Sequence, residues 1–575
     1  MFAARPATAA HVTSGRAPKL VLCVIDAMAP EMLVRAAESG AAPVLAELLE
    51  RGSYVPDCVS AFPSVTPVCA ASIVTGFAQD EHLIPGMNWY SRSEGRYVEY
   101  GSSLRAAQRF GIGRQLTDTV YNMNRAHLSA DTPTVFETLD DAGVRTAGTT
   151  YLMYRGRYRH EPQRDTPLAR ALAGTLARHP VMGPKELFYA DIFASRKTGC
   201  RSTLGMPGVR DRHSACVSAY MVEHDLFDFL LLSFPDNDWH SHKRGPESQL
   251  TSIAAADVQL ARVMEASGGI DEFLAEHALI VMADHSQALV TDTIDLQRDL
   301  ADLGVAQPEG GLLAGLAGAL VGIGLRGRAS SETAVAGHEA EGGHEAEGDG
   351  EGCDDVAGDG SPSVPGGAHS AAARARRPDA GEVEPRIAVC PSQRAAMVYA
   401  LRLDERDAMR ASVVARAASI EGVDLIAWLE RDAHDEPVEA VLRSPARGEL
   451  RFAPGGELLD ARGQRWRLDG DPAAIGASVG PGNLLTNPEY PDALGRVWSA
   501  LQCPTSGEVL LSAAPGYEFV DWGGAAHVGG GSHGSLHRSD SLAPLLFCGI
   551  APPAERPGQW AIRDVASLVR AHFEV

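Results

Sequence analysis

The chain has 575 residues, of which 45% are hydrophobic, and it carries a formal net charge of −23. Its length exceeds that of one ordinary core, so we expect one large domain with insertions, or two domains. The acidic balance argues against a general nucleic-acid binder and against a binder of anionic membranes, whereas bound cations would let such a protein hold an anion.

The nine cysteines are odd in number, widely scattered and without Cys-x-x-Cys spacing. This pattern argues against a disulfide framework and against a cysteine-type zinc site. Residues 1–18 contain no continuous apolar segment, so we predict a flexible start rather than a secretory signal, and hence a cytoplasmic location. The apolar run at residues 312–325 is rich in Gly and Ala and too short to span a bilayer, which indicates a buried helix or a mobile flap.

The first predicted strand, Lys19–Ile25, is a β-rich apolar run that ends at Asp26. Such a run is typical of a central parallel strand, and ligands gather at the carboxyl ends of these strands. Asp26 is therefore placed at an edge where ligands bind, although a lone Asp there is also a common turn residue. Helical patterns follow at Pro30–Glu38 and Pro43–Arg51.

Residues 62–76 read FPSVTPVCAASIVTG, with a hydroxyl residue directly before a proline and a short apolar helical run. We predict that Thr66 is the N-cap and Pro67 the first helical residue. A helix N-terminus offers unpaired N–H groups and a positive dipole end, which suit a phosphate group. Thr66 is thus either a simple cap or a reactive residue.

Downstream, residues 82–90 are predicted to form a loop in which Asn88 either reaches a substrate oxygen or faces solvent. Helices and strands then alternate along the chain. The predicted helices are 133–139, 214–223 and 249–267, and the predicted strands are 143–150, 227–234 and 278–283. This alternation predicts an α/β fold with a mostly parallel central sheet and helices on both faces.

The strand at 227–234 runs directly into PDNDWHSHKRGP. There Asp236 and Asp238 each have a histidine four residues later, His240 and His242. An i, i+4 pair lies on one face of a helical turn, and a carboxylate with an imidazole suits zinc. A polar, solvent-exposed loop is the alternative.

The strand at 278–283 ends at the adjacent pair Asp284-His285. Three predicted strands therefore deliver carboxylates, and the carboxyl ends of parallel strands lie at one edge of a sheet. We expect Asp26, one of the two Asp-x-x-x-His pairs, and Asp284 to meet there.

The segment 328–386 changes to acidic low-complexity sequence with repeated GHEAEG, which predicts a disordered linker. Its His338 and His344 could bind metal weakly, although a solvated segment is favoured. A strand near 396–401, a helix at 405–418 and a β-rich stretch through Trp466 predict a small α+β insertion at 387–480. A strand at 507–512 then leads to GGGSHGSLHRSD, whose glycines can bring His533 close to a metal or phosphate, with His537 as a competitor.

In order, the chain presents Asp26, Thr66, an Asp-x-x-x-His pair, Asp284-His285 and His533. This order resembles the alkaline phosphatase superfamily, specifically its nucleotide pyrophosphatase/phosphodiesterase-like (type I phosphodiesterase) branch. FPSVTPVCAASIVTG is similar to the nucleophile segment of that branch, and DWHSHKRGP is similar to its Asp-x-x-x-His-x-x-Gly-Pro segment. The second similarity selects Asp238 and His242, because Gly245-Pro246 stand at the right distance only from His242.

The resemblance runs from Lys19 to Ile550, and it implies an alkaline-phosphatase-like catalytic core. The implied core consists of residues 19–327 and 481–575, with the acidic linker and the α+β insertion between them. It also implies two divalent metal ions, zinc by resemblance, although such ligands also accept manganese or iron. One ion would be held by Asp26, Asp284 and His285 with the Thr66 oxygen, and the other by Asp238, His242 and His533. Thr66, activated by metal, would form a phosphothreonine intermediate, and Asn88 would contact the phosphate.

The implied function is hydrolysis of a phosphodiester or pyrophosphate bond in a small nucleotide-like molecule, without duplex or membrane binding. The aromatic pair Trp89-Tyr90 would suit a nucleobase, although packing is the commoner role of such a pair. The alternatives are a phosphomonoesterase, a phosphonate hydrolase, a phosphotransferase of the cofactor-independent mutase type, and a catalytically inactive binding protein. Cys69 stands where many relatives carry Asn, and Ser286-Gln287 replaces a common Gly-Met, so the substrate contacts follow less directly than the metal ligands.

Overall fold

The computed structural model describes residues 18–163, 179–189, 192–201, 209–308, 384–550, 552 and 558–575. All of these except Glu384 belong to one compact unit. The predicted flexible start lies outside these ranges apart from Pro18. The apolar run 312–325 and the acidic linker with His338 and His344 also lie outside them, apart from residues 384–386.

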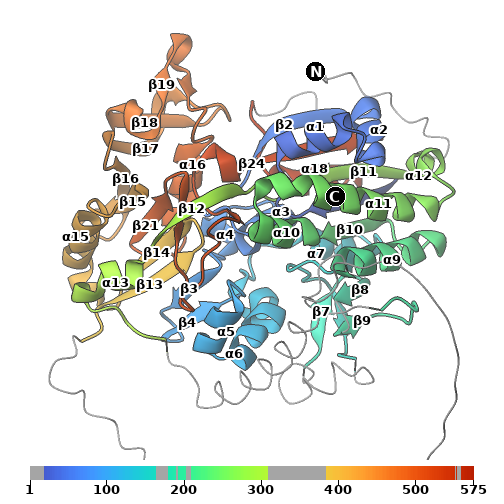
Figure 1. Cartoon of the computed structure of the whole chain (residues 1–575), viewed down its shortest axis with the longest axis horizontal. Helices are drawn as coiled ribbons and strands as arrows, with labels where there is room; N and C mark the ends of the chain where they lie inside the picture. Colours follow the sequence, from blue (N-terminus) through green and yellow to red (C-terminus); the bar gives the residue numbers. More distant parts are fainter. Residues whose placement is uncertain are drawn as a thin grey trace, which may run out of the picture. The chain divides into compact units, whose positions relative to one another are not determined.

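An eight-stranded sheet forms the centre of the unit (Figure 1), in the order β2-β24-β11-β1-β10-β5-β8-β9. Its strands are β1 (Lys19–Ile25), β2 (Ser53–Val59), β5 (Thr146–Thr149), β8 (Glu186–Tyr189), β9 (Phe193–Ala194), β10 (Phe229–Phe234), β11 (His277–Met282) and β24 (Leu542–Cys548). The five strands from β11 to β8 run parallel. β24 and β9 run antiparallel to them at the two sides, and β2, beyond β24, runs in the same direction as the five. The predicted α/β fold with a mostly parallel sheet is confirmed.

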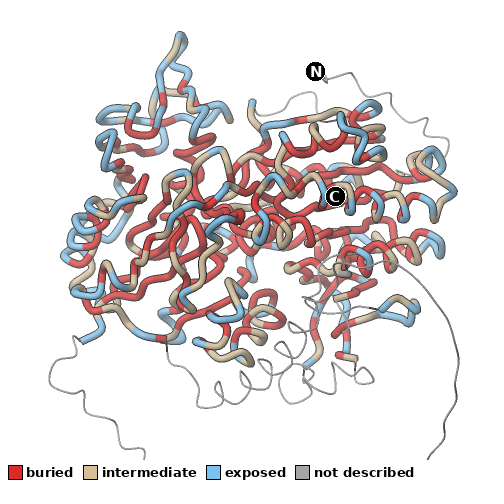
Figure 2. Tube along the Cα trace, in the orientation of Figure 1, coloured by how far each residue is buried: buried red, intermediate tan, exposed pale blue. Residues whose placement is uncertain are grey.

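Helices cover both faces of this sheet because alternate strand residues point to opposite sides. Leu20, Leu22 and Val24 of β1 belong to one apolar cluster, whereas Val21, Cys23 and Ile25 belong to another. The first cluster includes α3 (Thr66–Thr75), α7 (Val135–Asp141) and α18 (Asp564–His572); the second includes α1 (Pro30–Glu38), α2 (Pro43–Arg51), α9 (Val209–Glu223), α11 (Gln249–Glu265) and α12 (Ile270–Glu276). Figure 2 accordingly shows buried strands between partly exposed helices.

A second, seven-stranded sheet has the order β13-β14-β21-β15-β16-β17-β18. Its strands are β13 (Ile387–Ser392), β14 (Ala395–Ala400), β15 (Val423–Arg431), β16 (Pro437–Ser444), β17 (Gly448–Leu459), β18 (Arg465–Gly470) and β21 (Val509–Ala513), and α15 (Arg406–Ala417) packs on it. The predicted insertion supplies six of the seven strands. The seventh, β21, comes from the segment predicted as the last part of the core, and the division into segments stays a prediction.

Smaller elements complete the described unit. They are α4 (Gln79–His82), β3 (Asn88–Ser91), β4 (Arg96–Glu99), α5 (Leu104–Phe110), α6 (Ile112–Thr117), a π-helix (Asp118–His127), β6 (Tyr158–His160), β7 (Val181–Gly183), α10 (Asp236–Arg244), β12 (Ala288–Ile294), α13 (Leu296–Asp299), β19 (Ser478–Val479), β20 (Leu485–Thr486), α16 (Ala493–Gln502), β22 (Gly516–Phe519), β23 (Gly531–Ser532) and α17 (Arg538–Ser541).

Two local predictions need correction. The N-cap of α3 is Val65, whose backbone is extended, so Thr66 is the first helical residue and not the cap. The predicted loop at 82–90 is structured at both ends, because His82 ends α4 and Asn88 begins a hairpin strand. By contrast, the Asp- and His-rich segment after β10 forms the helix α10, so the helical turn is confirmed over the alternative loop.

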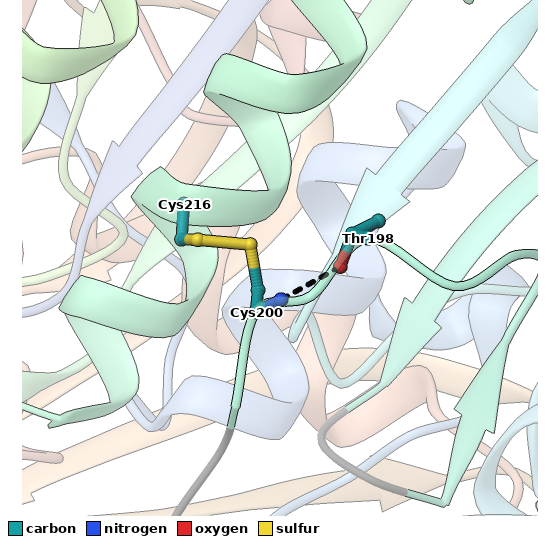
Figure 3. Close-up of a disulfide and its surroundings, with 3 residues drawn as sticks. All are labelled: Thr198, Cys200 and Cys216. Carbon is teal, nitrogen blue, oxygen red and sulfur yellow. Dashed lines mark hydrogen bonds between the residues drawn. A yellow bond between two sulfur atoms is a disulfide. The ribbon is translucent and has the colours of Figure 1, made fainter.

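One disulfide, Cys200–Cys216, ties the chain before α9 to that helix, with a Cα–Cα distance of 5.9 Å (Figure 3). The cysteine spacing did not predict this pair, because two cysteines 16 residues apart in the sequence form no recognisable motif. The remaining described cysteines are free and buried. Disulfides are typical of oxidising compartments, so the cytoplasmic location stays a prediction. Within the described residues, no helix is both long and apolar enough to cross a membrane.

Candidate active site

Three neighbouring strands bring their following residues together at one edge of the central sheet. β11, β1 and β10 are adjacent and parallel, and Ile25 pairs with Phe234. Asp26 follows β1 directly, and Asp284 follows β11 after one residue. The Ala27 N–H donates to Asp284 Oδ1 at 3.1 Å, and the Asn237 amide of α10 donates to the Asp26 carbonyl at 2.8 Å. These bonds hold the three strand ends in register, as predicted.

The first group of potential ligands surrounds His285. Its Nε2 lies 3.4 Å from Asp284 Oδ2, 3.7 Å from Asp26 Oδ1 and 3.3 Å from the Thr66 hydroxyl. Asp26 Oδ1 is buried and has no hydrogen-bond partner among the described residues. A buried carboxylate oxygen without a protein partner has the chemistry of a cation ligand.

The second group surrounds Asp238 on α10. Asp238 Oδ1 lies 3.3 Å from His242 Nε2 and 3.6 Å from His533 Nε2. The rings of His533 and His285 stack with centroids 3.8 Å apart, so the two groups are neighbours. Both Asp26/Asp284/His285 and Asp238/His285/His533 have donor atoms close enough together to hold a metal ion.

The three histidines are oriented by backbone carbonyls. Nδ1 of His242, His285 and His533 faces the carbonyls of Gly531 at 2.8 Å, Ser286 at 3.1 Å and Ser64 at 2.8 Å, respectively. A carbonyl only accepts, so each Nδ1 carries the proton and each Nε2 keeps its lone pair towards the carboxylates. This arrangement is typical of histidines that ligate a metal.

The electrostatics of the site also fit cations. Burial, followed by the charges of Asp284 and Asp238, raises the pKa of Asp26 well above its usual range. Burial opposes ionisation of Asp238, but the neighbouring His242 and then His533 outweigh it and lower the Asp238 pKa. A bound divalent cation would compensate these clustered carboxylates.

The competing histidines and aspartate lie elsewhere. Asp236 accepts from Arg210 at 2.9 Å, and His240 lies 3.3 Å from an Arg244 guanidinium nitrogen. His537 caps α17 and contacts Glu489 at 3.1 Å. None of these three residues joins either group.

Asn88 is buried in β3, and its amide donates to Val98 and Glu99 at 3.0 Å each, while its Oδ1 has no partner among the described residues. Among the described residues, no hydrogen bond joins the Asn88 side chain to either group of potential ligands. Trp89 is also buried and donates to the Tyr100 hydroxyl at 3.2 Å. This contact agrees with the packing role of the aromatic pair.

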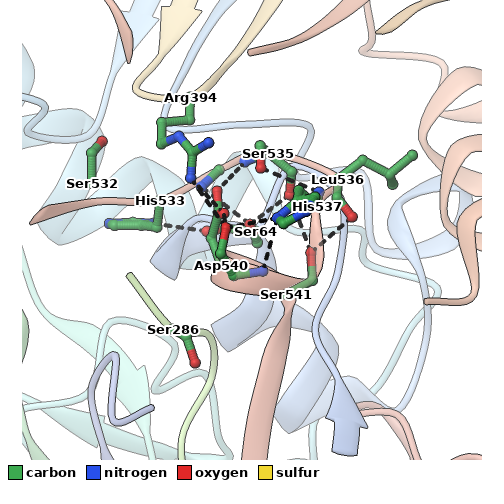
Figure 4. Close-up of polar contacts among 12 residues, drawn as sticks. Ser64, Ser286, Arg394, Ser532, His533, Ser535, Leu536, His537, Asp540 and Ser541 are labelled. Carbon is green, nitrogen blue, oxygen red and sulfur yellow. Dashed lines mark hydrogen bonds and ion pairs between the residues drawn. The ribbon is translucent and has the colours of Figure 1, made fainter. Parts of the chain in front are cut away.

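Several supporting residues could not be recognised in the sequence. Gln287 donates to Asp238 Oδ1 at 2.5 Å, although Gln287 was noticed only as a departure from relatives. The buried pair Arg394–Asp540 holds the loop that carries His533 (Figure 4), and the Arg394 N–H donates to the His533 carbonyl at 2.8 Å. These partners are far apart in the chain, so no local spacing reveals them.

Comparisons with known proteins give one family and several solved structures. The family model for type I phosphodiesterase / nucleotide pyrophosphatase matches residues 20–374. Phosphonoacetate hydrolase from Sinorhizobium meliloti 1021, in complex with phosphonoformate, is 15% identical over 99% of this chain and 100% of that chain, with a TM-score of 0.49. Murine ectonucleotide pyrophosphatase / phosphodiesterase 5 is 11% identical over 97% of this chain and 95% of that chain, also with a TM-score of 0.49. No curated protein matches.

Proposed function

Because the chain belongs to the type I phosphodiesterase / nucleotide pyrophosphatase family, whose members hydrolyse phosphoric ester or anhydride bonds, we propose that it cleaves a phosphodiester or pyrophosphate bond in a small nucleotide-like molecule. The observation that carries this proposal is the position of the Thr66 hydroxyl. It stands at the start of α3, 3.3 Å from His285 Nε2, and that nitrogen lies 3.7 Å from the unpaired Oδ1 of Asp26.

Two sets of residues would hold metal ions in this proposal. They are Asp26, Asp284 and His285 with the Thr66 oxygen, and Asp238, His242 and His533. Bound divalent cations, zinc by donor type and resemblance, would supply the Lewis acidity that makes a threonine hydroxyl nucleophilic near neutral pH.

Thr66 is the nucleophile in the proposed reaction. Its oxygen attacks phosphorus, the bond from phosphorus to the leaving-group oxygen breaks, and phosphothreonine forms at residue 66. Water then attacks the same phosphorus and releases the product with Thr66 restored. The N-terminus of α3 presents its positive dipole end to the phosphoryl oxygens.

The test compares hydrolysis of bis-p-nitrophenyl phosphate with that of p-nitrophenyl phosphate, with zinc and with chelator. We expect diesterase activity that exceeds monoesterase activity, disappears with chelator, and falls by at least about 1,000-fold in Thr66→Ala. Thr75→Ala is the matched control, because Thr75 lies on the same helix and its hydroxyl donates to the Ala71 carbonyl.

Each failure has a distinct meaning. An active Thr66→Ala variant would refute the threonine nucleophile. Preference for the monoester would favour a phosphomonoesterase, and metal binding without turnover of either compound would favour a narrow substrate such as a phosphonate. A chain that binds no metal and hydrolyses neither ester would favour an inactive binding protein.

A further inference from the structure

Three consecutive hydroxyl residues lie at the end of the next strand along the same sheet edge. β5 lies beside β10, and its last residue, Thr149, pairs with Leu232 two residues before Phe234, which pairs with Ile25. Thr150 and Tyr151 follow the end of β5 directly. Tyr151 therefore stands two strands away from Asp26, on the edge where ligands of open α/β sheets bind.

All three hydroxyl oxygens are buried and lack a hydrogen-bond partner among the described residues. These atoms are Thr149 Oγ1, Thr150 Oγ1 and Tyr151 Oη. Buried hydroxyls in folded proteins nearly always have partners, so each exception requires an explanation. Of the three, Tyr151 belongs to the same apolar cluster as the residues around Thr66, so its hydroxyl indicates a ligand there that supplies the missing partner.

The backbone at this point is also unusual. Thr150 has φ +48°, in the left-handed region that β-branched residues rarely adopt. Its N–H donates to the Phe188 carbonyl at 2.8 Å, which fixes this conformation. Strained backbone of this kind clusters at ligand sites, where the surrounding structure imposes it.

Tyr151 belongs to the apolar cluster that contains Val65 and Cys69, on either side of Thr66 in the chain. Burial, and then the neighbouring Asp284, raise the pKa of the Tyr151 phenol well above its usual value. The phenol therefore stays protonated at neutral pH and can donate a hydrogen bond.

We propose that the Tyr151 hydroxyl donates a hydrogen bond to a non-bridging oxygen of the phosphoryl group that reacts with Thr66. This inference rests on the proposed function. A neutral donor suits the single negative charge of a diester, because a dianionic monoester would add a further negative charge beside Asp26 and Asp284. Tyr151 is thus a catalytic residue that favours diesters over monoesters.

The experiment uses the full-length, zinc-loaded chain and the variant Tyr151→Phe. We expect kcat/KM for bis-p-nitrophenyl phosphate to fall about 100-fold, as for the loss of one donor to a reacting oxyanion, with kcat falling more than KM rises. Bound zinc and Tm should remain at wild-type values. Tyr154→Phe is the matched control, because the Tyr154 hydroxyl donates to the Val120 carbonyl, and it should retain wild-type kcat/KM.

Activity of Tyr151→Phe within twofold of wild type would overturn the inference, and so would a loss of bound zinc, because the hydroxyl would then support the metal ligands instead. If the wild type hydrolyses neither ester, the proposed function itself fails. A second measurement then tests whether the Tyr151 hydroxyl binds a phosphate diester. Dimethyl phosphate should raise the Tm of the wild type and of Tyr154→Phe but not of Tyr151→Phe. An equal Tm shift in all three proteins would overturn it.

Discussion

At the scale of single residues, Asp26 is the clearest sign that this site is built for a cation. Its Oδ1 is buried without a partner among the described residues, and the charges of Asp284 and Asp238 repel a charge on Asp26.

We predict that Asp26→Asn is more stable than wild type in chelator, because the substitution removes a buried charge. With zinc at about 100 times its Kd, the wild type should gain about 3 kcal/mol, whereas the variant should lose most of that gain. Thermal unfolding with and without chelator measures both effects, and a less stable variant in chelator would contradict the prediction.

Glu99, in the hairpin that carries Asn88, gives a pH-dependent prediction. Burial is the main cause that raises the pKa of Glu99 from 4.5 to about 7, against hydrogen bonds from Ser102 and Gly101. A raised carboxyl pKa means that folding favours the protonated form, so stability is lost as pH rises from 4.5 to 7. Glu99→Gln should therefore match wild type at pH 4.5 and exceed it by up to about 3 kcal/mol at pH 8.

Urea unfolding at the two pH values measures this difference. Glu457→Gln, at an exposed position of β17, is the control and should show no such trend. A stability gain of Glu99→Gln that is equal at both pH values would contradict the pKa argument.

The candidate ligands could be predicted from the sequence because each follows a recognisable strand or glycine turn. The locations of Asp26, Asp284 and His285 follow from the rule that the carboxyl ends of parallel strands lie at one edge of the sheet. Tyr151 also follows a predicted strand, but only the structure shows that its hydroxyl is buried without a partner among the described residues. Gln287 could not be found in this way, since its contact is with Asp238, far away in the chain.

At the scale of elements, the loop from β23 to α17 depends on the buried pair Arg394–Asp540 (Figure 4). Asp540 accepts from Arg394 at 2.6 Å and from the Ser535 N–H at 2.8 Å, while the Arg394 N–H holds the His533 carbonyl. We predict that Asp540→Asn costs about 3–5 kcal/mol, because it leaves a buried guanidinium without its counter-charge. Bound zinc should also fall, since His533 loses its support.

Urea unfolding and the zinc content of the purified variant test this prediction. The control is Glu161→Gln, which removes an exposed pair with Arg159 and should cost less than about 1 kcal/mol. Wild-type zinc content in a folded Asp540→Asn protein would show that the pair does not position His533.

Strands and long helices followed from apolar patterns, and β1, α1 and α2 have the predicted ends. The helix α10 was harder to predict, because DNDWHSHKR is rich in residues that favour turns and caps. Tertiary contacts decide in its favour: Asn237 and Ser241 are buried, and Asn237 bonds to the Asp26 carbonyl. Such contacts are invisible in a local pattern.

At the scale of the whole molecule, the second sheet combines strands that are far apart in the sequence. β21 lies between β14 and β15, although more than 75 residues separate β21 from β15 in the sequence. The sequence predicted β14, β21 and a β-rich stretch between them, but it missed β13 and could not predict this order, since the order depends on long-range pairing.

The chain on either side of residues 309–383 is joined by backbone pairing. Val305 forms a parallel bridge with Ile387, the Gly304 carbonyl accepts from Arg386 and Ile387, and the Ala306 N–H donates to Ile387. Since extended backbone rises by about 3.3 Å per residue, a linker between Pro308 and Pro385 must span on the order of 20 Å, which about ten Gly and Ser residues can do. We predict that replacing residues 309–383 with such a linker keeps the Tm within about 3 °C and retains the diesterase activity.

The control is a full-length variant in which the order of residues 328–383 is shuffled at constant composition. It separates the effect of their sequence from the effect of their length. Loss of folding in the shortened chain would show that residues 309–383 contribute to the core, whereas loss of activity alone in both variants would assign their sequence a role in substrate binding.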